Sequence, residues 1–307
     1  MDIRNYAIAL PAAAGLAALL LTACSGGASS HPPAATTTSP ARDSAASTVS
    51  VTAQEDSNWA GYVIGSNPTT TTATTTAGTS FSSVSGSWTQ SAADCASGSP
   101  SHSAFWVGIG GYTGTHLEQT GTSADCSASG QATYSVWYEL VPAAQAPVTM
   151  TVQPGDKLSA RVAVSGDKVS ISISDLTRHV TFSKQLTMSG PTVSSAEWIA
   201  EAPSRCESAS SQDCHILSLA DFGSVTFTGA SASAGGKAGS ITSGLAPVTA
   251  LTLEANPGFG RLYATAAQAD ASPGALSGNG SSFTVSWQRP EIQMPASPVF
   301  VTGPLYH

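Results

Sequence analysis

The chain has 307 residues and a formal net charge of −8, and only 10% of its residues are charged, where a typical soluble domain carries about 25%. Lysine and arginine together number 11 and form no cluster. This argues against a nucleic-acid partner and against a basic membrane-binding surface. Cysteine occurs five times, an odd number, so in an exported protein at least one cysteine does not pair within the chain.

The first residues are typical of an export signal. An apolar run, Tyr6 to Leu21, follows Arg4 and predicts a signal peptide over residues 1–23. The run ends in Leu21-Thr22-Ala23-Cys24, which resembles the lipobox of bacterial lipoproteins, where the cysteine is acylated. We therefore expect Cys24 to carry a lipid and the protein to be extracellular or at the cell surface. The alternative is an ordinary signal peptide cut near Ala23, with Cys24 incidental.

The chain after the signal divides into three predicted parts. Residues 24–53 consist largely of Ser, Gly, Ala, Pro and Thr, a composition that cannot bury a core and predicts a flexible tether. Residues 54–288 are predicted to form one domain, because their composition shows no break. Residues 289–307 are rich in proline and are predicted to be a tail.

The predicted domain is all-β. Between Arg161 and Leu186 apolar and polar residues alternate around a turn at Ser165-Gly166-Asp167-Lys168, which is typical of an antiparallel hairpin. No segment after Leu21 has a convincing helical period. Similar strand patterns occur at Trp59–Ile64, Phe81–Trp88, Phe105–Ile109, Tyr134–Leu140, Val148–Val152, Ala196–Ala200, Val225–Thr228 and Phe283–Trp287. About a dozen such strands predict a β-sandwich of two antiparallel sheets, of the jelly-roll or concanavalin A-like kind.

Four cysteines remain in the domain: Cys95, Cys126, Cys206 and Cys214. Outside the cytoplasm they suggest two disulfides, for which three pairings exist. The short spacing of Cys206 and Cys214 favours a local loop and leaves Cys95 with Cys126. A zinc site is a weak competitor, since no CxxC or HxxxH spacing accompanies them.

Common hydrolase motifs are absent from the sequence, which has no GxSxG, no HExxH and no Asp-Thr/Ser-Gly. Carboxylates and an amide instead occur beside tryptophans within apolar strand segments. Strand alternation places Leu117 and Gln119 on one face, Trp137 and Glu139 on one face, and Glu197, Ile199 and Glu201 on one face. From the pattern alone, these positions also fit the outward polar face of ordinary strands.

Seven short blocks occur in the order seen in the glutamic peptidases, or eqolisins, and the chain resembles that family from Asp56 to Thr228. The blocks are Ser57-Asn58-Trp59-Ala60-Gly61, Phe105-Trp106-Val107-Gly108-Ile109-Gly110-Gly111, Leu117-Glu118-Gln119-Thr120-Gly121, Val136-Trp137-Tyr138-Glu139, Pro154-Gly155-Asp156, Ala196-Glu197-Trp198-Ile199 and Ala220-Asp221-Phe222-Gly223. The resemblance implies a sandwich of two seven-stranded sheets and a pepstatin-insensitive acid endopeptidase with a Gln–Glu dyad. Gln119 and Glu197 match that dyad.

The resemblance also implies a mechanism without metal, cofactor or covalent intermediate. Glu197, ionised, would take a proton from a bound water and later pass it to the leaving nitrogen. The Gln119 amide would hold that water and stabilise the oxyanion. Trp106, Glu139 and Trp137 would position a protein or peptide substrate, and activity should fall as pH rises. We expect a monomer that contacts a membrane only through Cys24.

Some residues do not fit this assignment. Glu118 and Glu201 lie next to the motifs, but alternation points Glu118 away from Gln119, and neither residue is assigned a role. Gly110 and Ser135 stand where fungal members have aspartates, which puts the subsite preference and the pH optimum in doubt. The alternative function is a non-catalytic carbohydrate-binding or peptide-binding lipoprotein, because β-sandwiches also serve as lectins.

Overall fold

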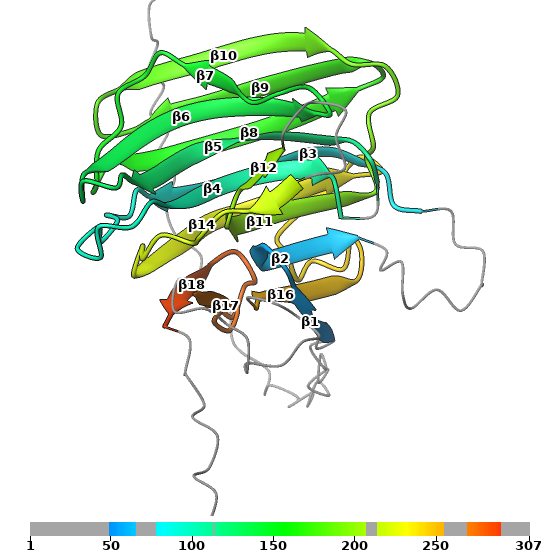
Figure 1. Ribbon diagram of the computed structural model, residues 1–307. Coiled ribbons are helices and arrows are strands. Elements are labelled where there is room, and N and C mark those ends of the chain that lie inside the picture. The colour runs from blue at the N-terminus through cyan, green and yellow to red at the C-terminus, as the bar shows by residue number, and fades with distance from the viewer. Residues whose placement is uncertain (1–48, 66–77, 113, 207–213, 255–268, 290–307) are drawn as a thin grey trace, which may run out of the picture. The chain divides into compact units, whose positions relative to one another are not determined.

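A computed structural model describes residues 49–65, 78–112, 114–206, 214–254 and 269–289 (Figure 1). The predicted signal peptide, Cys24, most of the tether and nearly all of the proline-rich tail lie outside the described residues, so they stay predictions. Within the described ranges there is no helix long and apolar enough to span a membrane.

The described residues form eighteen strands and no helix. In chain order the strands are β1 (Val51–Asp56), β2 (Trp59–Gly65), β3 (Phe81–Thr89), β4 (Ser101–Gly110), β5 (Leu117–Cys126), β6 (Ala132–Val141), β7 (Ala146–Val148), β8 (Lys157–Ser165), β9 (Lys168–Asp175), β10 (Val180–Thr187), β11 (Ser195–Glu201), β12 (Ser204–Cys206), β13 (Cys214–Ile216), β14 (Ser224–Ala234), β15 (Lys237–Gly239), β16 (Val248–Leu253), β17 (Asp270–Pro273) and β18 (Phe283–Gln288).

Most of the strands form one hydrogen-bonded path that folds over into two layers. The order is β10-β9-β8-β3-β14-β18-β17-β16-β2-β11-β4-β5-β6-β7 (Figure 1). Side chains bond across the layers: Trp88 Nε1 on β3 donates to Thr122 Oγ1 on β5 at 3.0 Å, and Trp198 Nε1 on β11 donates to Ser85 O on β3 at 2.8 Å. The predicted all-β sandwich is confirmed, with one exception to its antiparallel pairing, because β1 pairs with β16 in parallel.

The hydrophobic core lies between the two layers and follows the alternation seen in the sequence. On β8 and β9, the buried apolar residues are Leu158, Ala160, Val162, Val164, Val169, Ile171 and Ile173. Burying each valine, leucine or isoleucine contributes roughly 1.5–3 kcal/mol. The predicted hairpin is confirmed, since Ser165 and Lys168 are register partners at its turn.

Some predicted boundaries differ from those of the strands in the structure. The strand expected at Val148–Val152 covers only Ala146–Val148, because Met150 N donates to Val148 O at 2.8 Å and turns the chain there. The predicted start of the domain at residue 54 falls inside β1, which begins at Val51.

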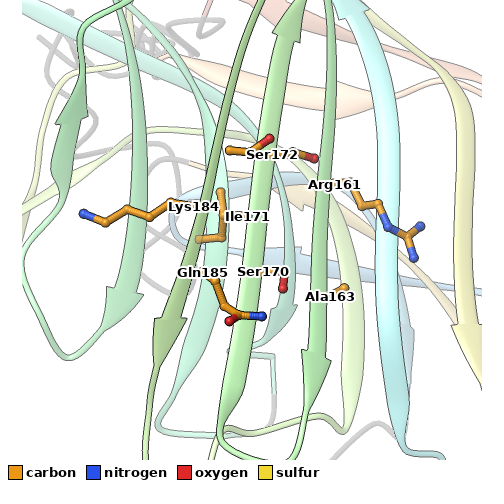
Figure 2. A pocket seen from close by; sticks show the side chains of 8 residues that line it. Arg161, Ala163, Ser170, Ile171, Ser172, Lys184 and Gln185 are labelled. Carbon is orange, nitrogen blue, oxygen red and sulfur yellow. The ribbon is translucent and has the colours of Figure 1, made fainter. Parts of the chain in front are cut away.

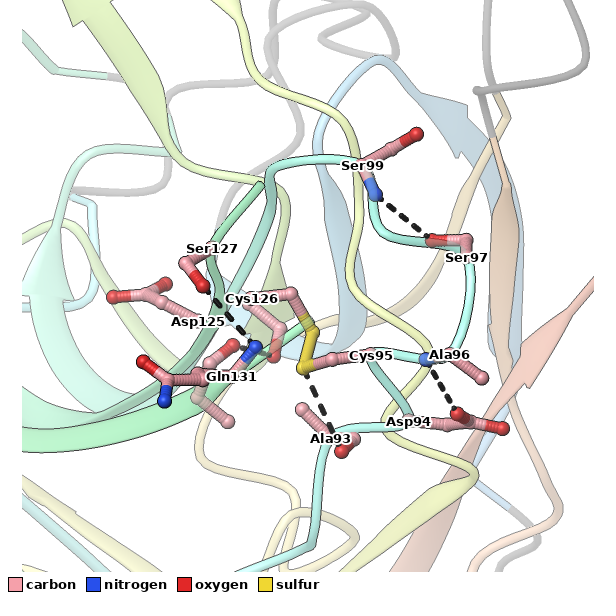
Figure 3. The surroundings of a disulfide bond; sticks show 12 residues. Ala93, Asp94, Cys95, Ala96, Ser97, Ser99, Asp125, Cys126, Ser127 and Gln131 are labelled. Carbon is pink, nitrogen blue, oxygen red and sulfur yellow. Dashed lines mark hydrogen bonds between the residues drawn. A yellow bond between two sulfur atoms is a disulfide. The ribbon is translucent and has the colours of Figure 1, made fainter. Parts of the chain in front are cut away.

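A disulfide joins Cys95 to Cys126, the last residue of β5, across a sequence separation of 31 (Figure 3). Closing a loop of this length stabilises the fold by about 3.5 kcal/mol in the chain-entropy account. Cys206 and Cys214 are register partners in the β12–β13 pair. Their disulfide stays a prediction.

Candidate active site

Five neighbouring strands bring the two dyad residues into one cross-strand row. The register of β6, β5, β4, β11 and β2 aligns, in this order, Glu139, Gln119, Gly108, Glu197 and Val63. These residues lie on the outer face of their layer, turned away from the other layer. We call this surface the Glu197 face. It also carries a small apolar cluster of Val63, Ala104, Trp106, Leu117, Trp137, Ile199 and Leu251.

Gly108 separates Gln119 from Glu197 in the row and places no side chain of its own between them. With strands about 4.8 Å apart, the two residues lie roughly 10 Å apart at Cα. A Cβ at Gly108 would lie 2.8 Å from Leu117 Cδ1 and 2.9 Å from Trp106 Cζ3. The position therefore accepts only glycine without local rearrangement. Sequence reasoning gave Gly108 no role of its own, although a glycine inside a strand is a signal of close approach.

The Gln119 amide is oriented by Glu139. Its Nε2 donates to Glu139 Oε2 at 2.9 Å, while its Oε1 has no hydrogen-bond partner among the described residues. The amide thus keeps one N–H and one carbonyl oxygen for other groups. Burial raises the pKa of Glu139, and the bond from Gln119 lowers it in part. The structure brings Glu139 to Gln119, where sequence reasoning expected it to contact substrate.

Glu197 is fully buried, and neither of its carboxyl oxygens has a hydrogen-bond partner among the described residues. Burial raises its pKa well above the ordinary value, and the charge of Glu118 adds to the rise. The Ser195 hydroxyl and the Tyr112 amide lie close enough to lower the pKa, yet they donate to no carboxyl oxygen of Glu197 and the rise dominates. A raised pKa favours the protonated form of the Glu197 carboxyl in acid, whereas the mechanism implied by the sequence starts from the ionised form.

The predicted substrate-positioning tryptophans lie in the adjacent row of the Glu197 face. Trp106 is 0% and Trp137 3% exposed, and Gly121 of β5 is the register partner of both. Trp106 Nε1 donates to Glu201 Oε2 at 2.7 Å. Trp137 Nε1 has no partner among the described residues. Sequence reasoning gave Glu201 no role, although alternation had placed it on the face of Glu197.

Glu118 points to the opposite side of the sheet, as strand alternation predicted. Its register partners are Ile109 and Leu140, which contribute to the core between the layers. It is 0% exposed, and its carboxyl oxygens have no hydrogen-bond partner among the described residues. Burial raises its pKa to about 8, so this carboxyl is neutral in acid and takes no part in the Glu197 face.

Gly110 stands in place of an aspartate for a backbone reason. Its φ is +93°, and a Cβ there would lie 2.5 Å from His116 O and 2.7 Å from Thr192 O. A side chain at this position would be strained whatever its chemistry. The missing aspartate at residue 110 is therefore part of how this chain turns after β4.

A separate hollow of about 400 Å³ lies on β8, β9 and β10, in the other layer (Figure 2). Arg161, serines and Gln185 line much of it. None of the predicted site residues takes part in it. Within the described ranges, no group of three or more His, Cys, Asp or Glu side chains is arranged to hold a metal ion.

Comparison with known proteins shows the family of this chain. The family model described as the Peptidase A4 family matches residues 57–272. The chain belongs to the peptidase A4 family. It is 37% identical over 199 residues to Aspergillopepsin-2 of Aspergillus niger, covering 59% of this chain and 65% of that protein. The chain thus spans slightly less than two thirds of the length of this A4 relative.

Solved structures of two peptidases resemble the fold of this A4 chain. Scytalido-glutamic peptidase with a transition-state analog inhibitor superposes with a TM-score of 0.56 at 26% identity, over 76% of this chain and 98% of that chain. SCP-B, an eqolisin in complex with the tripeptide Ala-Ile-His, superposes with a TM-score of 0.53 at 26% identity over the same shares.

Proposed function

We propose that this peptidase A4 chain is an acid endopeptidase that uses Gln119 and Glu197 to hydrolyse protein substrates. Membership of the family supports the reaction class. The observation that carries the assignment of residues is the row Gln119–Gly108–Glu197, in which the glycine places no side chain of its own between an amide and a carboxyl. Gln119 Oε1 and both Glu197 oxygens have no hydrogen-bond partner among the described residues, which supports their use in binding a water and a peptide carbonyl.

The raised pKa of Glu197 defines how the carboxyl works. A neutral carboxyl group has one oxygen that accepts a proton and one O–H that donates. As Gln119 holds a water against the scissile carbon, one Glu197 oxygen takes the water proton while the other gives its proton to the carbonyl oxygen. The carboxyl stays neutral and a tetrahedral diol forms. Glu197 then protonates the leaving nitrogen and recovers a proton from the diol as the C–N bond breaks.

This role sets the direction of the pH dependence. The active form is protonated Glu197, so activity is retained below its pKa in the complex and is lost as the pH rises through that value. Because burial raises the pKa of Glu197, activity should extend above the ordinary carboxyl range near pH 4. The Gln119 amide does not titrate, so it adds no further rise or fall to the dependence of activity on pH.

The test is digestion of one denatured protein at a series of pH values, read by mass spectrometry. Glu197→Gln and Gln119→Ala should fold and lose at least about 100-fold in kcat/KM at pH 3–4, as expected when a proton-transfer group or an oxyanion donor is removed. Glu118→Gln is the matched control, since this buried carboxyl lies on the opposite face, and it should keep activity in acid. Full activity in either dyad variant would refute the assignment. A folded wild type without proteolysis would favour the binding-module alternative.

We also propose export, with a lipid on Cys24. The Cys95–Cys126 disulfide supports an extracellular location, because disulfides persist in oxidising compartments. Cys24→Ser should move the full-length chain from the membrane fraction of its host to the medium. An unchanged distribution would contradict the anchor, and light scattering of the released protein would check the expected monomer.

A further inference from the structure

We propose that Glu201 is a positioning residue that fixes the Trp106 ring over Gly108, the residue between Gln119 and Glu197 in the row. The inference rests on the proposed function, because that function places the reaction at Gln119 and Glu197. It goes beyond it by giving a role to a residue outside the dyad and its predicted substrate contacts.

Glu201 collects hydrogen bonds from two other segments. Trp106 Nε1 donates to its Oε2 at 2.7 Å, and Asn58 Nδ2 donates to its Oε1 at 3.1 Å. Asn58 is itself held, since its backbone N–H donates to Asp56 Oδ1 at 3.0 Å. The Trp59 ring packs edge-on against Trp106 with centroids 5.0 Å apart. The Trp106 indole is therefore held by its hydrogen bond to Glu201 and by its contact with Trp59.

The opposite end of the Trp106 indole lies over Gly108. Cζ3 belongs to the six-membered ring, at the far edge from Nε1, and a Cβ at Gly108 would lie 2.9 Å from it. Gly108 is the residue between Gln119 and Glu197 in the row. Because the indole is rigid, the bond to Glu201 at one edge sets where the other edge lies. Misplacement by about 1 Å near a reacting group can cost about 100-fold in rate.

The bond does not require a charged Glu201. The carboxyl contacts two neutral donors, and burial raises its pKa to about 8. A glutamine has the same shape and retains an oxygen that can accept from Trp106. Glu201→Gln therefore preserves the proposed positioning, whereas Glu201→Leu removes it and keeps a similar volume.

The experiment is a double-mutant cycle on Glu201 and Trp106 at pH 4. Glu201→Leu should lower kcat/KM about 10-fold to 100-fold, and Glu201→Gln should stay within about threefold of the wild type because the acceptor remains. Trp106→Phe removes the N–H donor. In that background Glu201→Leu should have little further effect, since the two changes break one interaction. Additive losses, or a Glu201→Gln loss as large as that of Glu201→Leu, would overturn the proposal.

Near-ultraviolet circular dichroism separates this proposal from the proposed function. Glu201→Leu should change the tryptophan signal and Glu201→Gln should preserve it, whether or not the protein cleaves substrate. If the wild type lacks proteolysis while the signal follows this pattern, the proposed function fails and the positioning of Trp106 stands. If Glu201→Leu leaves both the signal and kcat/KM unchanged, the positioning role fails alone.

Discussion

Buried carboxyl groups occur in two regions of the molecule, and the surroundings of the two groups are opposite. In the layer that carries the Glu197 face, Glu197 and Glu201 on that face and Glu118 on the opposite side contact no cation among the described residues, and burial raises the pKa of each. At the start of β8 and the end of β9, Asp156 and Asp175 are 4% and 0% exposed. There Arg178 Nε lies 2.9 Å from Asp156 Oδ2 and 3.3 Å from Asp175 Oδ2.

Backbone N–H groups also donate to the two aspartates beside Arg178, Asp156 and Asp175, which together with it form the Arg178 cluster. Gln153 N donates to Asp156 Oδ2 at 2.7 Å, and Thr177 N and Arg178 N donate to Asp175 Oδ1 at 2.9 and 3.0 Å. These contacts give the two aspartates backbone donors and a nearby cation, although Asp175 Oδ2 has no hydrogen bond of its own. The Glu197 face offers its carboxyls only neutral donors or none. Burial therefore occurs in two different electrostatic surroundings, and the surroundings as well as the burial act on a carboxyl.

Removing Arg178 should have the largest effect on stability. Arg178→Met leaves two buried carboxylates without their cation, a change that costs about 3–5 kcal/mol for a broken buried pair. Urea unfolding at pH 6 would measure it. Arg161→Met, an exposed arginine on β8, is the control and should stay within about 0.5 kcal/mol. Equal losses in the two variants would show that Arg178 does not compensate the buried charges.

Glu118 should make the fold less stable as the pH rises. Its pKa is about 8 in the folded protein against 4.5 for an ordinary glutamate carboxyl, so between these values the folded state binds a proton that the unfolded state has lost. The free energy of unfolding therefore falls with pH, by about 1.4 kcal/mol per unit. In Glu118→Gln this contribution is absent.

Urea unfolding at pH 5 and pH 6.5 isolates that contribution. The wild type should lose about 2 kcal/mol more than Glu118→Gln over this interval. Glu197 and Glu201 remain in both proteins, so their own effects cancel in the difference. If the free energy of unfolding changed equally with pH in the wild type and in Glu118→Gln, Glu118 would not be a neutral carboxyl in the folded protein.

Much of the fold could be predicted because the alternation of residues along a strand shows which of them lie on each of its two faces. The alternation that separates Glu118 from Gln119 is local, and the structure agrees with it. The hairpin at Ser165–Lys168 is local as well. The parallel pairing of β1 with β16 joins segments about 200 residues apart in sequence, and nothing in either segment selects the other.

The same difference between local and nonlocal information applies to the candidate site residues. The motifs indicate Gln119 and Glu197, but the partner of Glu201 lies 95 residues away in Trp106. That contact depends on the register of β4 against β11, where Glu201 faces Ala104. The pKa of Glu197 depends on what surrounds the carboxyl in space, and burial raises it. Burial and side-chain contacts between distant strands are nonlocal, so the sequence pattern did not indicate either point.

The smallest effect is expected for Glu139→Gln, which tests whether a carboxyl of the Glu197 face acts in its neutral form. Glu139 accepts from Gln119 Nε2 at 2.9 Å, and burial raises its pKa, so in acid it works as a neutral acceptor that a glutamine can replace. Glu139→Gln should keep kcat/KM at pH 4 within about threefold, or roughly 0.7 kcal/mol. Glu139→Leu removes the acceptor, leaves the Gln119 amide unaligned and should lose about tenfold or more.

The same exchange in the Arg178 cluster should behave differently. Asp156→Asn also swaps a carboxyl for an amide, but it removes the anion that Arg178 contacts, and the loss of a charged hydrogen bond costs about 1.5–3 kcal/mol of unfolding free energy. If Glu139→Gln is as damaging to activity as Glu139→Leu, then Glu139 works as a carboxylate. In that case a carboxyl of the Glu197 face would act in its charged form although no cation contacts it among the described residues.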